Sequence, residues 1–138
     1  MSTRNTFYYN KNKNDEIRAG GLLIYKIENN EIFLLLIENR GLYEDIGGCS
    51  DINDDSIYET IIREVEEETN NIIKKENINE LLNNSDEFYN KKCKYLLLII
   101  KANEFLQTLN SEQFGDKEIH DNINRKIKWI SINEFFDK

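Results

Sequence analysis

Two nearly continuous apolar runs near the start of the chain predict two β-strands. Residues 20–27 and 31–37 are rich in Leu and Ile and show little alternation with polar positions. Such runs are typical of strands that are covered on both faces. Residues 28–30 lie between them and end in two asparagines, which tolerate the left-handed backbone of a tight hairpin. The pattern therefore predicts a hairpin in a sheet that lies between helices.

The apolar spacing changes to a helical period over residues 57–69. Ser56 is followed three residues later by Glu59, which is the pattern of a capping box, and apolar residues recur every four positions from Ile57 to Val65. This is the clearest helix that the sequence predicts. We expect Asn70-Asn71 to end it, because asparagine is the usual second choice to glycine in a left-handed cap.

The remaining segments are shorter and less regular. The sequence predicts a short helix over 78–82, a surface loop over 83–92, a fully buried strand over 95–100, and mostly loop over 103–125. Residues 126–130 alternate as a half-exposed strand does, and Ser131 with Glu134 predicts the cap of a final short helix. The polar residues 1–16 predict a flexible N-terminal arm, which leaves a single domain over 17–138.

Composition and charge narrow the classes of protein. A chain of 138 residues that is 39% hydrophobic can bury the core of one ordinary domain. The net charge of −8 argues against a nucleic-acid-coating surface or an anionic membrane as the main partner. No apolar run reaches the ~18 residues of a membrane span. Without a secretory signal, Cys49 and Cys93 are expected to be free thiols, and we expect a soluble, cytoplasmic protein.

Three glutamates on the predicted helix are the first sign of chemistry. Glu64, Glu67 and Glu68 stand at i, i+3 and i+4, so their carboxylates share one face. Like charges at this spacing each destabilise a helix by ~0.2–0.5 kcal/mol, and Arg63 can neutralise only one of them, Glu67, at i+4. The net-negative, oxygen-rich face suits a hard cation such as Mg²⁺ or Mn²⁺. A solvated acidic surface is the alternative.

The segment before this helix contains Gly47 and Gly48, which allow the backbone to approach a ligand closely. The order of strand, glycine loop and acidic helix resembles the Nudix hydrolase family. Its motif is a glycine, five residues, a glutamate, seven residues, and then Arg-Glu-aliphatic-any-Glu-Glu-any-Gly-aliphatic. The matching residues are Gly48, Arg63, Glu64, Val65, Glu67 and Glu68.

The chain departs from the motif at three places. Asp55 takes the place of the first glutamate, and one extra residue in the loop 49–54 separates it from Gly48. Asn70 replaces the closing glycine and Asn71 the last aliphatic residue. None of these changes removes a carboxylate from the acidic core, so the resemblance implies an active, slightly divergent site.

The resemblance implies a fold and a reaction. The fold would be α/β, a Nudix-type α/β/α sandwich around a mixed β-sheet. The protein would be a metal-dependent hydrolase that cleaves the pyrophosphate bond of a nucleoside diphosphate linked to another moiety. The implied ligands of Mg²⁺ or Mn²⁺ are Glu64, Glu67, Glu68 and the carbonyl of Gly47, with Arg63 orienting a glutamate. The metal would activate the attacking water, and either Glu64 or Glu118 would take its proton.

Four further residues are candidates for substrate binding. Arg18 and Arg40 flank the predicted sheet and could bind phosphates bidentately, or only solvate the surface. Tyr43 lies beside the glycine loop and could stack on a base, or pack in the core. His120, the only histidine, lies with Glu118 in a predicted loop and could contact substrate there, or remain in solvent.

Other functions stay open at this point. Residues 43–48 and 118–121 more loosely resemble small Nudix proteins of giant viruses and phages, which makes capped RNA a possible substrate and an mRNA-decapping enzyme an alternative. A Nudix-fold sensor that binds a nucleotide without cleaving it is another. Residues 51–62 begin like a calcium loop, but Ile62 stands where the bidentate glutamate is needed, which makes a calcium sensor a poor match.

Overall fold

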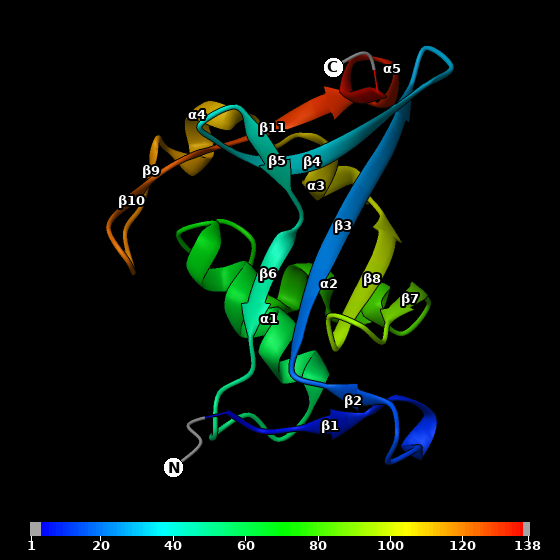
Figure 1. Ribbon diagram of the computed structural model, residues 1–138. Coiled ribbons are helices and arrows are strands. Elements are labelled where there is room, and N and C mark those ends of the chain that lie inside the picture. The colour runs from blue at the N-terminus through cyan, green and yellow to red at the C-terminus, as the bar shows by residue number, and fades with distance from the viewer. Residues whose placement is uncertain (1–3, 137–138) are drawn as a thin grey trace.

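A computed structural model describes residues 4–136, and its centre is one mixed β-sheet (Figure 1). The strand order is β11 (Lys126–Ser131), β4 (Glu31–Asn39), β3 (Ala19–Glu28), β8 (Tyr95–Lys101) and β7 (Asp86–Asn90); β5 (Leu42–Glu44) pairs with β4, and β6 (Ile46–Cys49) pairs with β3. Only β3 and β8 run parallel, and the other pairs are antiparallel. The mixed sheet expected from the sequence is confirmed.

The hairpin between β3 and β4 forms as the sequence predicts. Asn29 and Asn30 have φ angles of 50° and 64°, and Glu28 pairs with Glu31 across the turn. The start of β3, residues 19–22, pairs with β6 instead of β4. Gly20 and Gly21 therefore lie opposite Gly48 and Gly47. This change of partner brings the glycine loop to the middle of the sheet.

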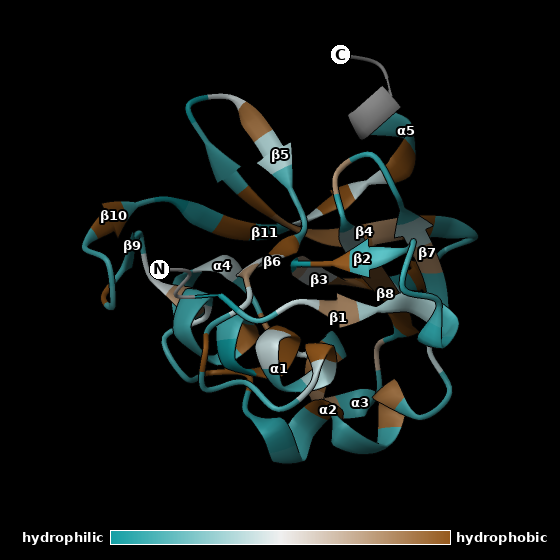
Figure 2. Cartoon of the chain, turned by 60° about the horizontal axis from the view of Figure 1, so that its bottom comes forward, coloured by the Kyte–Doolittle hydropathy of each residue, from teal (hydrophilic) through white to brown (hydrophobic). Residues whose placement is uncertain are grey.

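Several of the helices cover one face of the sheet. The helices are α1 (Ile57–Glu68), α2 (Lys75–Leu82), α3 (Glu104–Gln107), α4 (Ser111–Phe114) and α5 (Ile132–Phe136). Figure 2 shows α1, α2 and α3 on the same side of the strands, whereas α5 lies apart from them against β4 and β11. The buried core joins alternate residues of β3, β4 and β8, such as Leu22, Leu35 and Leu98, to apolar side chains of these helices. None of the helices within residues 4–136 is long and apolar enough to cross a membrane.

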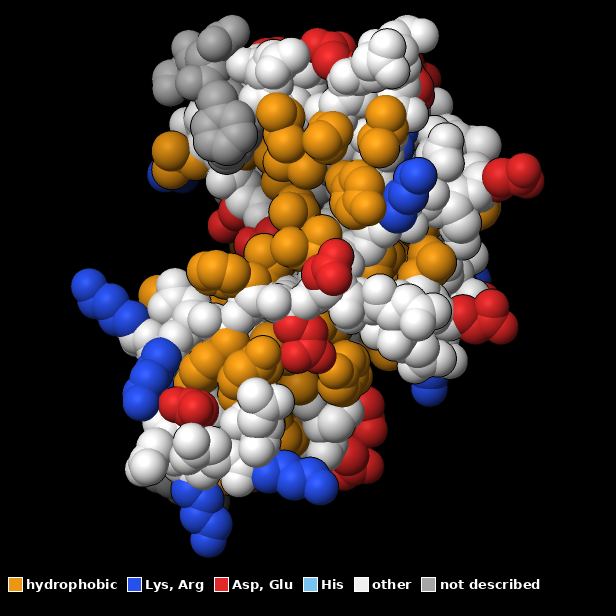
Figure 3. All heavy atoms as spheres, turned by 90° about the vertical axis from the view of Figure 1, so that its right-hand side faces the viewer, with side chains coloured by type: hydrophobic (Ala, Val, Ile, Leu, Met, Phe, Trp, Pro, Cys, Tyr) orange, Lys and Arg blue, Asp and Glu red, His pale blue; other side chains and the backbone are white. Residues whose placement is uncertain are grey.

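The opposite face of the sheet is covered less completely than the apolar runs predict. The residues of this face include Leu23, Tyr25, Leu97 and Ile99, which are half-buried, and Ile27, Ile32 and Phe88, which are exposed. Figure 3 looks at the side that carries β7, β8 and the β3–β4 hairpin, and shows hydrophobic side chains gathered there. The expectation that residues 95–100 form a fully buried strand is therefore wrong, because its alternate residues lie on this open face.

Three segments contain more regular structure than the sequence predicts. The loop expected over 83–92 contains β7, whose polar residues fit an edge strand that faces water on one side. The loop expected over 103–125 contains α3, α4 and the two-residue strands β9 (Lys117–Glu118) and β10 (Ile123–Asn124). The described part of the arm contains β1 (Phe7–Tyr8), the 3-10 helix η1 (Tyr9–Lys11) and β2 (Glu16–Ile17). Elements this short have no periodicity for a sequence to reveal.

Candidate active site

Helix α1 carries the acidic residues, and its two ends form as predicted. The Ser56 hydroxyl accepts a hydrogen bond from the Glu59 amide (3.2 Å), while the Glu59 carboxylate accepts from the Asp55 amide (3.3 Å), one residue before the capping-box partner. Asn70 and Asn71 end the helix with φ angles of 54° and 62°. The apolar stripe of α1 faces β3 and β6, so the helix packs against the two strands that contain the paired glycines, here called the glycine strands.

Glu64 lies against the backbone of Gly48. A Cβ atom added to Gly48 would stand 2.5 Å from the carboxyl carbon of Glu64, so a side chain there would displace the Glu64 carboxylate. Gly47 faces the other side, where a Cβ would stand 2.2 Å from the carbonyl oxygen of Gly20. The paired glycines therefore allow strand β6 to pass between β3 and the acidic face of α1.

Arg63 lies between two groups of carboxylates. Its Nη1 is 3.1 Å from Glu64 and 3.5 Å from Glu67, which confirms the predicted i, i+4 ion pair with Glu67. On the other side, its Nε and Nη2 donate to the two oxygens of Asp54, at 3.2 and 3.0 Å. Nη2 also donates to the Cys49 carbonyl (3.0 Å). The hydrogen bond to Asp54 is the main cause that raises the pKa of Arg63, so the guanidinium stays charged.

Asp54, and not Asp55, is the acidic partner of Arg63. Asp54 is 5% exposed, whereas Asp55 is exposed to solvent. The Asp54 carboxylate accepts further hydrogen bonds from the Thr60 hydroxyl (2.7 Å) and the Asp51 amide (2.8 Å). Burial raises the pKa of Asp54, but the hydrogen bonds from Arg63, Thr60 and Asp51 outweigh it and hold the pKa below its ordinary value. The extra residue relative to the motif thus follows Asp54 and is not in loop 49–54.

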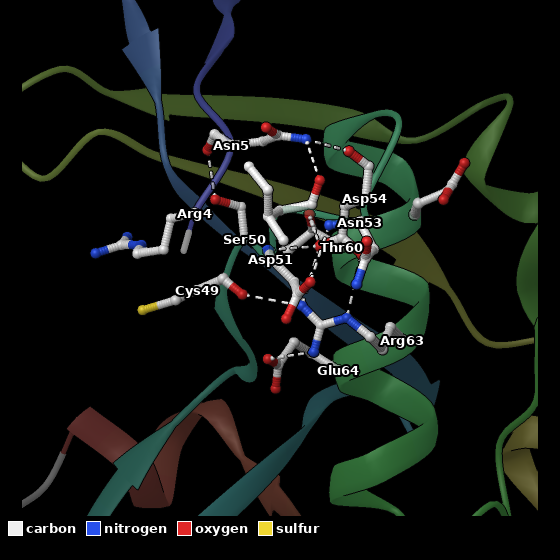
Figure 4. A network of polar contacts seen from close by, with 12 residues as sticks. Arg4, Asn5, Cys49, Ser50, Asp51, Asn53, Asp54, Thr60, Arg63 and Glu64 are labelled. Carbon is white, nitrogen blue, oxygen red and sulfur yellow. Dashed lines mark hydrogen bonds and ion pairs between the residues drawn. The ribbon is translucent and has the colours of Figure 1, made fainter. Parts of the chain in front are cut away.

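The N-terminal segment holds the loop that carries Asp54 (Figure 4). The Asn5 side-chain amide donates to the carbonyls of Ile52 (3.0 Å) and Asp54 (2.7 Å). The Ser50 hydroxyl donates to the Asn5 carbonyl (2.5 Å). A segment that lies more than 40 residues away in the sequence therefore fixes the loop before α1.

The end of α1 carries carboxylates with few partners. Burial, and after it the negative charge of Glu118 and Glu64, raises the pKa of Glu68 to about 7. Burial also raises the pKa of Glu64, and Arg63 offsets this only in part. Glu118, on β9, is 1% exposed; its Oε2 accepts from the Asp121 amide (2.8 Å), but its Oε1 has no hydrogen-bond partner. The charge of Arg125 lowers the pKa of Glu68 in part, but its guanidinium donates to backbone carbonyls and to none of these carboxylates. These groups together therefore form a region in which negative charge is only partly compensated.

This region has the donor chemistry of a divalent-cation site. Carboxylate oxygens are the preferred ligands of Mg²⁺ and Mn²⁺, and a buried oxygen without a partner, as in Glu118, is an available donor. As they are placed, however, no three acidic, His or Cys side chains of the described residues are grouped closely enough to hold an ion. Glu64 and Glu67 are both engaged with Arg63 instead. The carboxylate oxygens of this region are therefore the kind of ligand that a divalent cation prefers.

Two cavities adjoin the acidic region. The smaller, about 430 Å³, is lined by Arg63, Glu67 and His120 among others. The imidazole Nε2 of His120 is 3.6 Å from Glu67. The larger, about 830 Å³, lies between the β4–β5 and β9–β10 hairpins, and its lining includes Arg40 and Glu44.

Two of the predicted substrate residues lie elsewhere. Arg18 and Tyr43 line neither of these two cavities. Arg18 belongs to the network at the start of α1, where its carbonyl accepts from Arg4 (2.7 Å) and from the Ser50 amide (3.0 Å). Cys49 and Cys93 are free, as predicted, and both are exposed.

Three residues that contribute to this arrangement were not singled out from the sequence as site residues. Five residues separate Asp54 from Gly48, as five separate the first glutamate of the motif from its glycine, so counting forward from the glycine finds Asp54. Asn70 was expected only as a helix cap, although its side chain also binds the segment that carries Glu118. Arg125 gives no signal, because its guanidinium donates only to backbone carbonyls, of Glu68, Phe114 and Gly115.

The sequence matches no protein-family model and no curated protein. The structure, in contrast, is similar to solved structures of C. elegans Ap4A hydrolase. One of them is a binary complex, with a TM-score of 0.50 and 22% identity, and the other has a TM-score of 0.52 and 19% identity. Each likeness covers 88% of this chain and 84% of the other. Shewanella oneidensis NrtR matches with a TM-score of 0.44 and 17% identity, over 87% of this chain and 54% of NrtR.

The likeness to the two Ap4A hydrolase structures defines the class of the protein by its fold. The chain is a Nudix-fold protein with a central mixed sheet. At 19–22% identity the likeness to those structures shows the fold alone. The activity must be argued from the residues of this chain.

Proposed function

We propose that this chain is a metal-dependent hydrolase that cleaves a diphosphate linkage in a nucleotide. One observation carries the proposal. Glu64 and Glu68 lie on the face of α1 below the glycine strands, and the buried Glu118 adds an oxygen without a partner to the same region. A fold that places several poorly compensated carboxylates together loses stability by it, and such groups are typical of functional sites.

The divalent ion would be held by Glu64, Glu67 and Glu68, with the Gly47 carbonyl as a further ligand. When bound, it would supply polarisation of a phosphoryl oxygen and a lower pKa for the attacking water. Arg63 stays charged and holds Glu64 and Glu67 on the same side of the helix. Glu118 accepts the proton of the attacking water in this proposal, because its Oε1 has no other partner, whereas Glu64 is paired with Arg63.

The substrate would extend from the acidic region into the larger cavity. A volume of about 830 Å³ lies in the range of roughly 300–1,000 Å³ that small-molecule sites have. Glu44 lines this cavity and also contributes to the raised pKa of Glu68, so the two regions adjoin. Arg40 and Lys126 bring positive charge to the same cavity and would bind phosphates. His120 would contact the substrate from the smaller cavity.

A nucleotide sensor with the same fold is the second candidate. The observation in its favour is that Arg63 engages both Glu64 and Glu67, so that neither carboxylate is free as placed. A sensor would bind the nucleotide through the same cavity and release no phosphate-containing product. Product release therefore separates the two candidates.

The experiment is a substrate panel with Mg²⁺ or Mn²⁺, with the products identified by mass. The panel contains nucleoside triphosphates, nucleotide sugars, dinucleoside polyphosphates, diphosphoinositols and capped RNA. We expect cleavage within a diphosphate linkage of at least one nucleotide, and loss of the activity on chelation of the metal. Binding without cleavage would favour the sensor, and turnover that survives chelation would overturn the metal assignment.

A further inference from the structure

Asn70 occupies the place where the Nudix motif has glycine, and its side chain makes contacts that glycine cannot make. Its Nδ2 donates to the carbonyls of Phe114 (3.0 Å) and Lys117 (2.8 Å). Its Oδ1 accepts from the amide of Ile119 (2.9 Å). One side chain at the end of α1 therefore uses both of its polar atoms to bind a segment 44 to 49 residues farther along.

The segment that Asn70 binds is the one that carries Glu118. Lys117 and Ile119 lie on either side of Glu118; the carbonyl of Lys117 accepts a hydrogen bond from Asn70, and the amide of Ile119 donates one to it. The Glu118 side chain itself is buried. Besides the pairing of β9 with β10, the contacts of Asn70 therefore hold the backbone on both sides of Glu118 against the end of α1.

Arg125 fastens the other end of the same segment. Arg125 is 4% exposed, and its guanidinium donates to the Glu68 carbonyl (2.6 Å) at the end of α1. It also donates to the carbonyls of Gly115 (2.7 Å) and Phe114 (3.2 Å). Arg125 therefore holds residues 114–115 against α1, while Asn70 holds Lys117 and Ile119, which flank Glu118.

We propose that Asn70 is a positioning residue that places the Glu118 carboxylate at the end of α1, by holding the backbone on both sides of Glu118. The departure from the motif at this position then has a purpose beyond the helix cap, since the cap alone needs only a residue that tolerates positive φ. The proposal rests on the proposed function as far as the role of Glu118 in hydrolysis is concerned.

The chain offers a matched pair of variants for the test, Asn70→Gly and Asn71→Gly. Both residues have positive φ, so glycine is tolerated at either and the helix end is preserved. With the substrate found in the panel, we expect Asn70→Gly to lower kcat about 10- to 100-fold, as lost supporting contacts do, with little change in KM. Asn71→Gly should behave like the parent protein.

A double-mutant cycle shows whether Asn70 acts through Glu118. In a protein that already carries Glu118→Gln, Asn70→Gly should lower kcat no further. Parent-like kcat in Asn70→Gly would overturn the proposal, and so would fully additive losses in the double variant, because Asn70 would then act independently of Glu118.

Amide hydrogen exchange of Ile119, followed by NMR, tests the contact without any substrate. We expect exchange at Ile119 to become about tenfold faster in Asn70→Gly and to stay unchanged in Asn71→Gly. Unchanged exchange in Asn70→Gly would overturn the positioning contact. If the parent protein cleaves no compound of the panel, the proposed function is contradicted but the positioning contact is not. Ile119 exchange still decides whether Asn70 holds the segment.

Discussion

Asp54 precedes the start of α1 and Glu68 lies at its end, and both carboxylates are largely shielded from water, but their surroundings differ in kind. Asp54 accepts hydrogen bonds from Arg63, Thr60 and the Asp51 amide, and its pKa lies below the ordinary value. Glu68 has Glu118 and Glu64 as neighbours, and its pKa rises to about 7. Negative charge is paired with donors at one end of the helix and only partly compensated at the other, where the charge of Arg125 lowers the pKa of Glu68 without a hydrogen bond to its carboxylate.

The difference indicates which carboxylates serve the fold and which serve a ligand. A buried charge with a full set of donors stabilises the conformation that holds it. A group of carboxylates without such donors lowers stability unless a cation is added. Arg63 lies between the two groups and contacts both, through Asp54 on one side and Glu64 on the other.

The largest expected effect is a loss of turnover when a carboxylate near the end of α1 is removed. Glu67→Gln removes a carboxylate from the proposed metal ligands, and we expect kcat to fall about 100-fold or more. The fold should stay intact, because Asp54 still holds Arg63. Glu59→Gln, which removes the same charge from the start of the same helix, is the control and should keep parent-like turnover. Equal rates in Glu67→Gln and the parent would remove the metal assignment.

The second largest effect is a loss of stability when the carboxylate that precedes the start of α1 is removed. Asp54→Asn leaves the Arg63 guanidinium without its bidentate partner. We expect the free energy of unfolding in urea to fall by about 2–3 kcal/mol, less than for a fully buried pair because Arg63 is partly exposed. Asp55→Asn, one residue later and exposed, should stay within about 0.5 kcal/mol of the parent. Equal effects of the two variants would contradict the assignment of Asp54.

The pH dependence of this stability follows from the lowered pKa of Asp54. A carboxyl group with a depressed folded-state pKa stabilises the protein above its unfolded pKa of about 3.9, and this contribution is lost as the pH falls through the folded value. The gap in unfolding free energy between the parent and Asp54→Asn should therefore be full at neutral pH and shrink in the acid range. Urea titrations at neutral and acid pH measure the gap, and a gap that is constant down to pH 3 would contradict this.

The sequence predicts the glutamates at the end of α1 better than it predicts the aspartate that precedes its start. The acidic face of Glu64, Glu67 and Glu68 is visible because helical spacing places residues four apart on one face. The motif spacing gives Asp54 when counted forward from Gly48 and Asp55 when counted back from Arg63. The contacts of Arg63 and the burial of Asp54, which only the structure shows, separate the two. Contacts between segments that are distant in the sequence cannot be predicted from the spacing of apolar and polar residues.

The fold shows the same limit. The β3–β4 hairpin and α1 are predicted well, because a turn and a cap are local signals. The edge strand β7 and the short elements between 103 and 125 are missed, because their residues take their structure from neighbours in space. Incomplete covering of one sheet face is missed for the same reason, since apolar runs do not show what packs on them.

The smallest expected effect has the opposite sign and sharpens the contrast most. Near pH 8, above its folded pKa of about 7, Glu68 is charged in the folded and unfolded protein, and burial and repulsion penalise only the folded one. Without metal, we expect Glu68→Gln to raise the free energy of unfolding by about 1 kcal/mol. This gain should vanish near pH 3, well below the unfolded pKa of about 4.3, where both states are protonated. The same exchange of carboxylate for amide should destabilise at Asp54 and stabilise at Glu68. A loss of stability in Glu68→Gln at pH 8 would mean that the end of α1 already has its compensating donors, and the case for a cation there would lose its physical basis.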